Sequence, residues 1–264
     1  MSKKIFLGVL ISVFMFTANL QASTDPSASL SGKQIMQRQD QINKGFHDEK
    51  AAGKMVLVNP KGKETIREFE YKQLEKNMTE GFKAMIKIEK PADLQGTGLL
   101  SHQNQGRPDD QWLYLPALKK TKRITGSAKS GRFIGSEFTF EDLSPKEVDD
   151  FDHKLLRDEV CGNVTCHVVE SVNKTGDSNY SKTVTWVHSI TFQNVKLELY
   201  NKKGALTKRA LFEDYKRLGE KFWRPYKVTM KDLVKKRETR LEFNDIKVSA
   251  GQGATDFTKK MLER

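Results

Sequence analysis

Alternating polarity recurs along most of this chain and restricts it to a mainly β fold. The clearest case is the segment 82–88 (FKAMIKI). Apolar side chains at every second position share one face there, two lysines lie on the other, and only Met85 interrupts the pattern. Such alternation is typical of an antiparallel sheet with one covered face and one solvated face.

Similar segments separated by turn signals extend this interpretation to one large sheet. Asn59-Pro60 and Lys203-Gly204 are examples of those turns. The pattern predicts strands at 55–58, 64–76, 82–88, 98–103, 111–115, 136–142, 165–172, 183–188, 195–200, 205–216, 222–230 and 237–248. Tight turns favour a meander, and a sheet of roughly ten strands must curl into a barrel or half-barrel.

Helical spacing appears only near the two ends of the mature chain. Apolar residues at 35, 36 and 42 predict a short helix over 32–43, behind a cap at Ser29 or Ser31. Phe257 and Met261, four residues apart, predict a second short helix within 255–264.

The N-terminus has the order of a cleavable export signal. Lys3 and Lys4 precede an apolar run over 5–18, and Ala22 supplies the small residue at the expected cleavage point. The run is shorter than the roughly 20 residues of a membrane span, and no second long apolar run follows. We therefore expect a signal peptide at 1–22, a flexible mature N-terminus at 23–31, and a single domain over 32–264 in the periplasm.

The chain is basic, with 46 Lys and Arg against 34 Asp and Glu and a formal charge of +12. The basic residues are spread along many segments, which indicates a solvated outer face. Weak attraction to an anionic membrane surface is the alternative. An exported protein seldom meets nucleic acid, so none is expected as a partner.

Two cysteines, Cys161 and Cys166, flank a turn that contains Gly162. In an oxidising compartment this arrangement favours a structural disulfide. A metal site would need more ligands than the nearby His167, and the spacing is not that of a redox-active Cys-x-x-Cys pair. No cysteine lies near residue 22, so lipid attachment there is not expected.

Motifs typical of enzymes are missing from the sequence, including a Gly-x-Ser-x-Gly elbow, His-Glu-x-x-His and a phosphate-binding glycine loop. The five histidines do not have metal-ligand spacing. The acidic pairs Asp109-Asp110 and Glu141-Asp142 are more simply explained as turn and strand-end residues than as catalytic carboxylates. We therefore predict no catalytic residue, no metal and no cofactor.

Aromatic residues concentrate in the predicted strands, where alternation places neighbours on a common face. Ordinary core packing would explain them. The functional alternative is an apolar cavity on the concave side of the curled sheet. The residues proposed to line that cavity are Trp112, Tyr114, Phe138, Phe140 and Trp186, together with Phe82 and Ile86 from the segment 82–88.

Long motifs in the middle of the chain resemble the LolA-like family of outer membrane lipoprotein-sorting proteins. They are the segment 110–118 (DQWLYLPAL), Arg123-Ile124 and the segment 133–143 (FIGSEFTFEDL), with support from 91–100 (PADLQGTGLL) and the closing segment 257–262. Glu137 stands where Asp is expected in the family, which keeps the charge.

The resemblance implies a mainly β half-barrel whose single curved antiparallel sheet is covered on its concave side by short helices. It also implies a periplasmic carrier that shields lipoprotein acyl chains or another lipid. We expect such a carrier to be non-enzymatic and monomeric. The alternative is an adaptor for an inner-membrane RND/MMPL-type exporter, with a cavity filled by its own side chains. Because a fold does not determine a function, the choice depends on the site.

Overall fold

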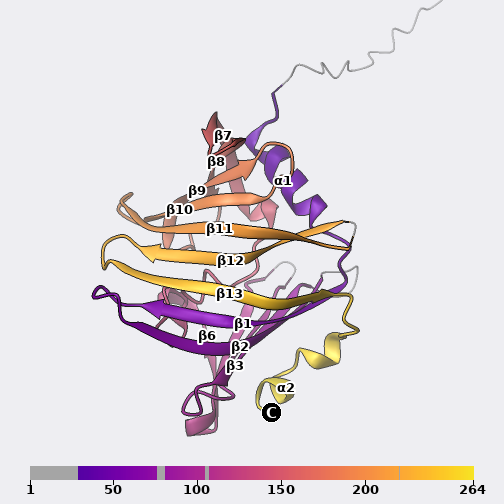
Figure 1. Ribbon diagram of the computed structural model, residues 1–264, viewed down its shortest axis with the longest axis vertical. Helices are drawn as coiled ribbons and strands as arrows, with labels where there is room; N and C mark the ends of the chain where they lie inside the picture. The colour runs from indigo at the N-terminus through magenta and orange to yellow at the C-terminus, as the bar shows by residue number, and fades with distance from the viewer. Residues whose placement is uncertain (1–28, 76–80, 105–106, 220) are drawn as a thin grey trace, which may run out of the picture.

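A single antiparallel sheet of thirteen strands forms the body of the protein (Figure 1). The computed structural model describes residues 29–75, 81–104, 107–219 and 221–264, so the expected signal peptide and most of the expected flexible segment lie outside it. The strands are β1 Asp48–Val58, β2 Glu64–Leu74, β3 Lys83–Lys90, β4 Gly98–His102, β5 Asp110–Leu115, β6 Lys120–Ile124, β7 Phe151–Cys161, β8 Val164–Asn173, β9 Tyr180–His188, β10 Asn194–Asn201, β11 Leu206–Leu218, β12 Phe222–Asp232 and β13 Arg237–Val248.

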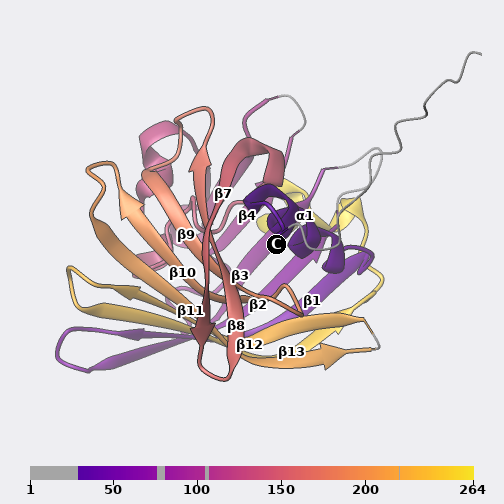
Figure 2. The ribbon, with the colours of Figure 1, turned by 90° about the horizontal axis from the view of Figure 1, so that it is seen from above.

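The sheet consists of two meanders joined at the middle, in the order β6-β5-β4-β3-β2-β1-β13-β12-β11-β10-β9-β8-β7. The chain starts at the centre with β1, runs outward to β6, and then crosses to the far edge at β7. From there it returns strand by strand to β13, which pairs with β1 so that Met55 lies opposite Leu241. The sheet curls and leaves one concave face, as expected for so many strands (Figure 2).

Residues 125–150, here called the crossing segment, connect the two edges and lie against the concave face. Phe133 and Phe140 belong to one core cluster with Phe69 of β2 and Leu99 of β4. Phe138 belongs to a second cluster with Leu199 and other residues of β10–β13. The crossing segment therefore supplies core to both halves of the sheet.

The strand predicted at 136–142 is wrong. The segment has strand-like alternation, but its backbone hydrogen bonds are formed with nearby residues of the same segment and not with a neighbouring strand. Phe133 N donates to the Phe138 carbonyl (2.9 Å), and Phe140 N donates to the Gly131 carbonyl (3.0 Å). Short 3-10 turns and an isolated bridge between Arg132 and Thr139 replace the ladder. The alternating aromatic residues of this segment therefore pack into two different core clusters, Phe138 into one and Phe140 into the other, and do not line one face of a strand.

The sequence missed β6 and β7, and these two strands are the edges of the sheet. Edge strands are commonly rich in charge, which prevents pairing with other chains. The β6 sequence KTKRI and the β7 sequence FDHKLLRDEVC have few apolar residues at alternate positions. The same property that protects these edges removes the alternation by which the other strands were recognised.

The N-terminal helix, α1 Gly32–Ile42, is confirmed. Ser31 is its N-cap and forms a capping box with Gln34. Ile35 is fully buried against Val169 and Val187, so the helix covers the concave side of β8 and β9. Figure 2 shows it above the opening of the half-barrel.

The C-terminal helix is shorter than expected, since only α2 Lys259–Leu262 is α-helical. Phe257 and Leu262 pack against Met85 of β3 and Leu100 of β4. These strand residues alternate with those that face the crossing segment, so α2 covers the convex face. The expectation that the helices cover the concave side holds for α1 and is wrong for α2.

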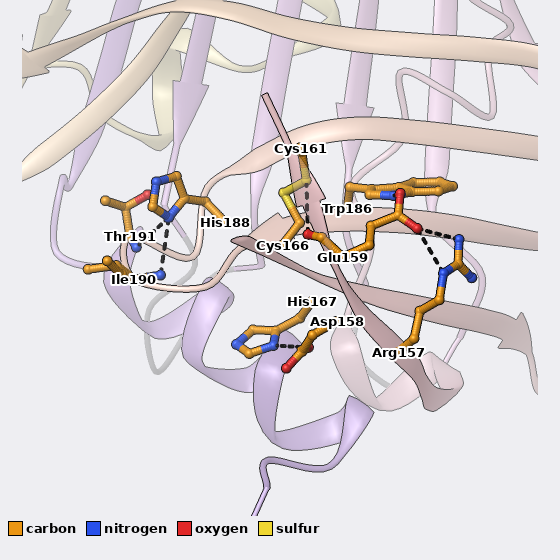
Figure 3. The surroundings of a disulfide bond; sticks show 10 residues. All are labelled: Arg157, Asp158, Glu159, Cys161, Cys166, His167, Trp186, His188, Ile190 and Thr191. Carbon is orange, nitrogen blue, oxygen red and sulfur yellow. Dashed lines mark hydrogen bonds and ion pairs between the residues drawn. A yellow bond between two sulfur atoms is a disulfide. The ribbon is translucent and has the colours of Figure 1, made fainter. Parts of the chain in front are cut away.

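The disulfide between Cys161 and Cys166 is confirmed and links β7 to β8 at the edge of the sheet (Figure 3). Cys166 is fully buried in a small cluster on the convex face with Val168 and Trp186. Glu159 accepts hydrogen bonds from the Trp186 indole and from Arg157 Nε (2.8 Å) beside it. The bond thus closes a hairpin that has a partner strand on one side only.

His102 makes the stability of the fold dependent on pH. Its Nε2 lies 2.7 Å from the Phe257 carbonyl and ties β4 to the segment before α2. Burial lowers the pKa of His102, and the hydrogen bond to Phe257 only partly offsets this. The native state therefore binds this proton less readily than the unfolded chain, whose histidine has a pKa of about 6.5.

We expect the free energy of unfolding to fall as the pH drops from 7 to 5, because the unfolded state gains the proton first. In His102→Gln this fall should be smaller. Urea unfolding followed by tryptophan fluorescence at several pH values measures it. An identical slope in the two proteins would contradict the prediction.

Candidate ligand-binding cavity

A cavity of about 340 Å³ lies between the concave face and the crossing segment. Its walls come from β1–β4 on one side and from β12 and β13 on the other, and the crossing segment covers it. The apolar lining residues are Met55, Phe69, Tyr71, Phe82, Ala84, Ile86, Leu99, Phe138, Leu143, Pro145, Pro225, Val228, Leu241, Phe243 and Ile246. A volume of this order is within the range of small-molecule sites, roughly 300–1,000 Å³.

One end of the cavity is polar. Arg224 Nε lies 2.7 Å from Glu49 Oε2, and both side chains line the cavity and are largely buried. The guanidinium also lies over the Phe46 and Phe222 rings, and Nη1 donates to Asn43 Oδ1 (3.1 Å) at the end of α1. A buried ion pair with this many partners keeps the end of the cavity polar and ordered.

Tyr71 and Gln73 of β2 add to this polar end. The Tyr71 hydroxyl donates to Gln73 Oε1 (2.8 Å), and burial raises the pKa of Tyr71 well above its usual range. The hydroxyl therefore remains protonated and serves as a neutral hydrogen-bonding group.

Asp142 and Glu137 fix the crossing segment to the sheet. Asp142 accepts hydrogen bonds from the Tyr180 hydroxyl (2.9 Å) and from the backbone of Thr139 (2.8 Å), and Lys208 Nζ lies 3.1 Å away. Burial and the neighbouring Asp142 raise the pKa of Tyr180. The side chain of Glu137 is 2% exposed and pairs with Arg132 (2.7 Å) and Arg237 (3.1 Å). The cavity wall is thus a fixed part of the fold.

The residues proposed from the sequence to line the cavity lie on two different faces of the sheet. Phe82, Ile86 and Phe138 line it. Phe140 is buried in the adjoining cluster of the same concave face, in edge-to-face contact with Phe133 at a ring distance of 6.3 Å. Contact of these residues with a ligand stays a prediction.

Trp112, Tyr114 and Trp186 lie on the convex face, outside this cavity. Trp112 and Tyr114 pack beneath α2, and Lys259 Nζ is 4.7 Å from the centre of the Trp112 ring. Trp186 lies with Cys166, and Lys196 Nζ is 3.4 Å from its ring centre. Alternation correctly placed Trp112 and Tyr114 on one face, but it cannot show whether that face is concave or convex.

Sequence reasoning missed the half of the cavity formed by β12 and β13. Val228, Leu241 and Phe243 line it, and the ion pair of Glu49 with Arg224 lies at its polar end. Leu241 and Phe243 are two residues apart in a predicted strand, which was the available signal. Glu49 and Arg224 are 175 residues apart in sequence, and only the pairing of β1 with β13 and of β13 with β12 brings them together.

The acidic pairs considered as catalytic candidates have structural partners. Asp110 is held by Arg107 (2.8 Å) and Arg123 in the β4–β6 region. Glu141 Oε2 accepts hydrogen bonds from the Asn179 backbone (2.8 Å) and side chain (2.6 Å). Within the described part of the chain, no three His, Cys, Asp or Glu residues gather in a way that could hold a metal ion. No helix there is long and apolar enough to cross a membrane.

The same fold occurs in a LolA superfamily protein from Nitrosomonas europaea, with a TM-score of 0.71 at 20% identity over 88% of this chain and 100% of that one. A crystal structure of an outer membrane lipoprotein-sorting protein domain from Vibrio parahaemolyticus is much closer. It has a TM-score of 0.84 and 35% identity over 88% of this chain and 98% of its own. The chain belongs to the LolA-like lipoprotein-sorting family.

Further comparisons gave one more similar structure and a matching family model. A DUF1329 family protein from Desulfovibrio piger has a TM-score of 0.83 and 25% identity over 88% of this chain and 97% of that one. A family model described only as "uncharacterized protein" matches residues 80–264. No curated protein matches the sequence.

Proposed function

We propose that this LolA-like protein is a periplasmic carrier that holds a lipid acyl chain, such as that of a lipoprotein, for transfer toward the outer membrane. The observation that supports it is the apolar cavity on the concave face, which has the pair Glu49–Arg224 at one end. Each CH₂ group of the acyl chain that is buried in the cavity contributes about 0.8 kcal/mol to the free energy of binding. Binding by burial needs no catalytic residue.

Two observations support the proposed periplasmic location. The N-terminus has the order of a cleavable export signal, and a related protein is described as sorting outer membrane lipoproteins.

The cavity predicts the effect of a bulky substitution. Leu241→Trp places a large ring in the cavity and should weaken binding of a fluorescent fatty acid at least tenfold. Delipidated protein titrated by fluorescence measures the affinity, and thermal unfolding checks the fold. The matched control is Ile66→Trp, because Ile66 is 50% exposed on the convex face. Equal affinities for both variants would exclude this cavity as the site.

One observation favours a second function, that of an exporter adaptor without its own ligand. The crossing segment already fills part of the concave face with Phe133, Phe138 and Phe140. An adaptor predicts that protein from the periplasm carries no lipid in native mass spectrometry and binds no fatty acid. Pull-down of an inner-membrane transporter by the same protein would then support it.

A further inference from the structure

Three neighbouring hairpin turns at one end of the sheet each present two lysines. They connect β1 to β2, β12 to β13 and β10 to β11, which follow one another in the strand order, and Figures 1 and 2 show their tips side by side. The six lysines, here called the lysine rim, are all exposed: Lys61, Lys63, Lys202, Lys203, Lys235 and Lys236. Adjacent hairpins in a sheet are about 10 Å apart, so the rim is one continuous cationic surface.

The three turns are held in the same way. In each, the side-chain oxygen of the first residue accepts two backbone N–H groups of the turn. Asn59 Oδ1 accepts from Lys61 and Lys63 (2.9 and 3.0 Å), Asn201 Oδ1 from Lys203 and Ala205 (2.9 and 3.1 Å), and Asp232 Oδ1 from Val234 and Lys235 (3.0 and 2.7 Å). The backbone that carries the lysines is therefore ordered before any partner arrives.

The lysines of the rim have no acidic partners among the described residues. Lys202 Nζ donates to the Gly176 carbonyl (2.9 Å), and none of the six forms an ion pair there. Several lysines on the convex face of the sheet are instead paired to glutamates, as in Lys50–Glu70 (2.7 Å) and Lys231–Glu238 (3.3 Å). Each of the three turns thus carries two lysines whose charge no ion pair compensates among the described residues.

Apolar side chains and a cleft accompany this charge. Val234 is 68% exposed and Leu233 is 37% exposed, in the middle turn of the three. A cleft of about 310 Å³ separates this turn from that of β1 and β2, and Asn59, Lys236 and Leu233 are among its lining residues. Exposed apolar groups between lysines match the interface of a bilayer, where headgroups lie above the first methylene groups.

We propose that the lysine rim docks the protein on a bilayer that contains anionic phospholipids, with Val234 and Leu233 entering the headgroup layer. The inference goes beyond acyl-chain binding and does not depend on it. Strands β1 and β12 run from the Glu49–Arg224 end of the cavity to the rim. A docked protein therefore holds that polar end away from the bilayer.

Sedimentation with vesicles tests the proposal on the full mature chain. We compare vesicles of phosphatidylcholine alone with vesicles that also contain phosphatidylglycerol. Binding is expected only to the anionic vesicles and should weaken with salt. Each lysine removed should reduce the affinity roughly fivefold, so Lys235→Gln with Lys236→Gln should reduce it roughly 25-fold. The matched control replaces Lys259 and Lys260 of α2 by Gln, which removes the same charge from the convex face.

Four results would overturn the proposal. The first three are equal binding to neutral and anionic vesicles, an equal loss in the α2 control, and unchanged binding when Val234→Ser removes the apolar contact. The fourth concerns a soluble polyanion. A protein that binds soluble polyglutamate as tightly as vesicles would indicate an acidic protein partner and exclude the bilayer. Fatty-acid titration of the Lys235/Lys236 variant should be unchanged, so failure of docking and failure of the carrier function remain distinguishable.

Discussion

Glu137→Gln is expected to lower the free energy of unfolding by about 3 kcal/mol, because it leaves two arginines without their shared carboxylate. The Glu137 side chain is 2% exposed, whereas those of Arg132 and Arg237 are 28% and 27% exposed. Because the arginines can recover part of their hydration, the expected loss of unfolding free energy lies at the lower end of the range for breaking a buried ion pair. Chemical denaturation followed by circular dichroism measures it.

The matched control for Glu137 is Glu68→Gln. Glu68 pairs with Lys90 at 2.9 Å on the surface, with side chains 41% and 69% exposed. Such a pair is worth about 1 kcal/mol or less. Glu137→Asp keeps the charge on a chain one CH₂ shorter and should lose less than Glu137→Gln. A loss for Glu137→Gln no greater than that of the control would show that this carboxylate does not hold the crossing segment.

Phe133→Ala should have a similar or larger effect, with a loss of about 3–5 kcal/mol. Phe133 is fully buried and packs among Phe69, Leu99 and Phe140 on the concave face. Removing the ring leaves a void that a well-anchored backbone cannot close. Urea denaturation measures the loss, with Leu118→Ala as the control, since Leu118 is 67% exposed and its truncation should change stability by less than about 0.5 kcal/mol.

A loss below about 1 kcal/mol for Phe133→Ala would mean that the crossing segment does not pack on the sheet as described. The cavity would then lack one wall, and its volume could not be used to argue for a guest. The two crossing-segment variants therefore also test the basis of the proposed carrier function.

Local alternation predicted most of the strands, because a sheet covered on one face imposes a period of two on the sequence. It failed at β6 and β7, where edge strands are charged, and at residues 136–142, where alternation serves two clusters. The disulfide and α1 were predicted from equally local signals: two cysteines around a turn, and a cap before apolar residues at helical spacing.

The sequence predicted an apolar cavity on the concave side of the sheet, but only some of the residues that line it. Phe82, Ile86 and Phe138 line it, whereas Trp112, Tyr114 and Trp186 lie on the other face of the sheet. A pattern of period two assigns residues to a common face without telling which face is concave.

The sequence by itself determined a mainly β chain with one long curled sheet, because alternation and turn chemistry act over a few residues. The position of the crossing segment, the pairing of Glu49 with Arg224 and the alignment of three lysine-bearing turns were decided only by the tertiary structure. They depend on β1 pairing with β13, a contact between the first and the last strand along the chain. No local pattern records such a contact, since its free energy comes from burial between segments that are distant in the sequence.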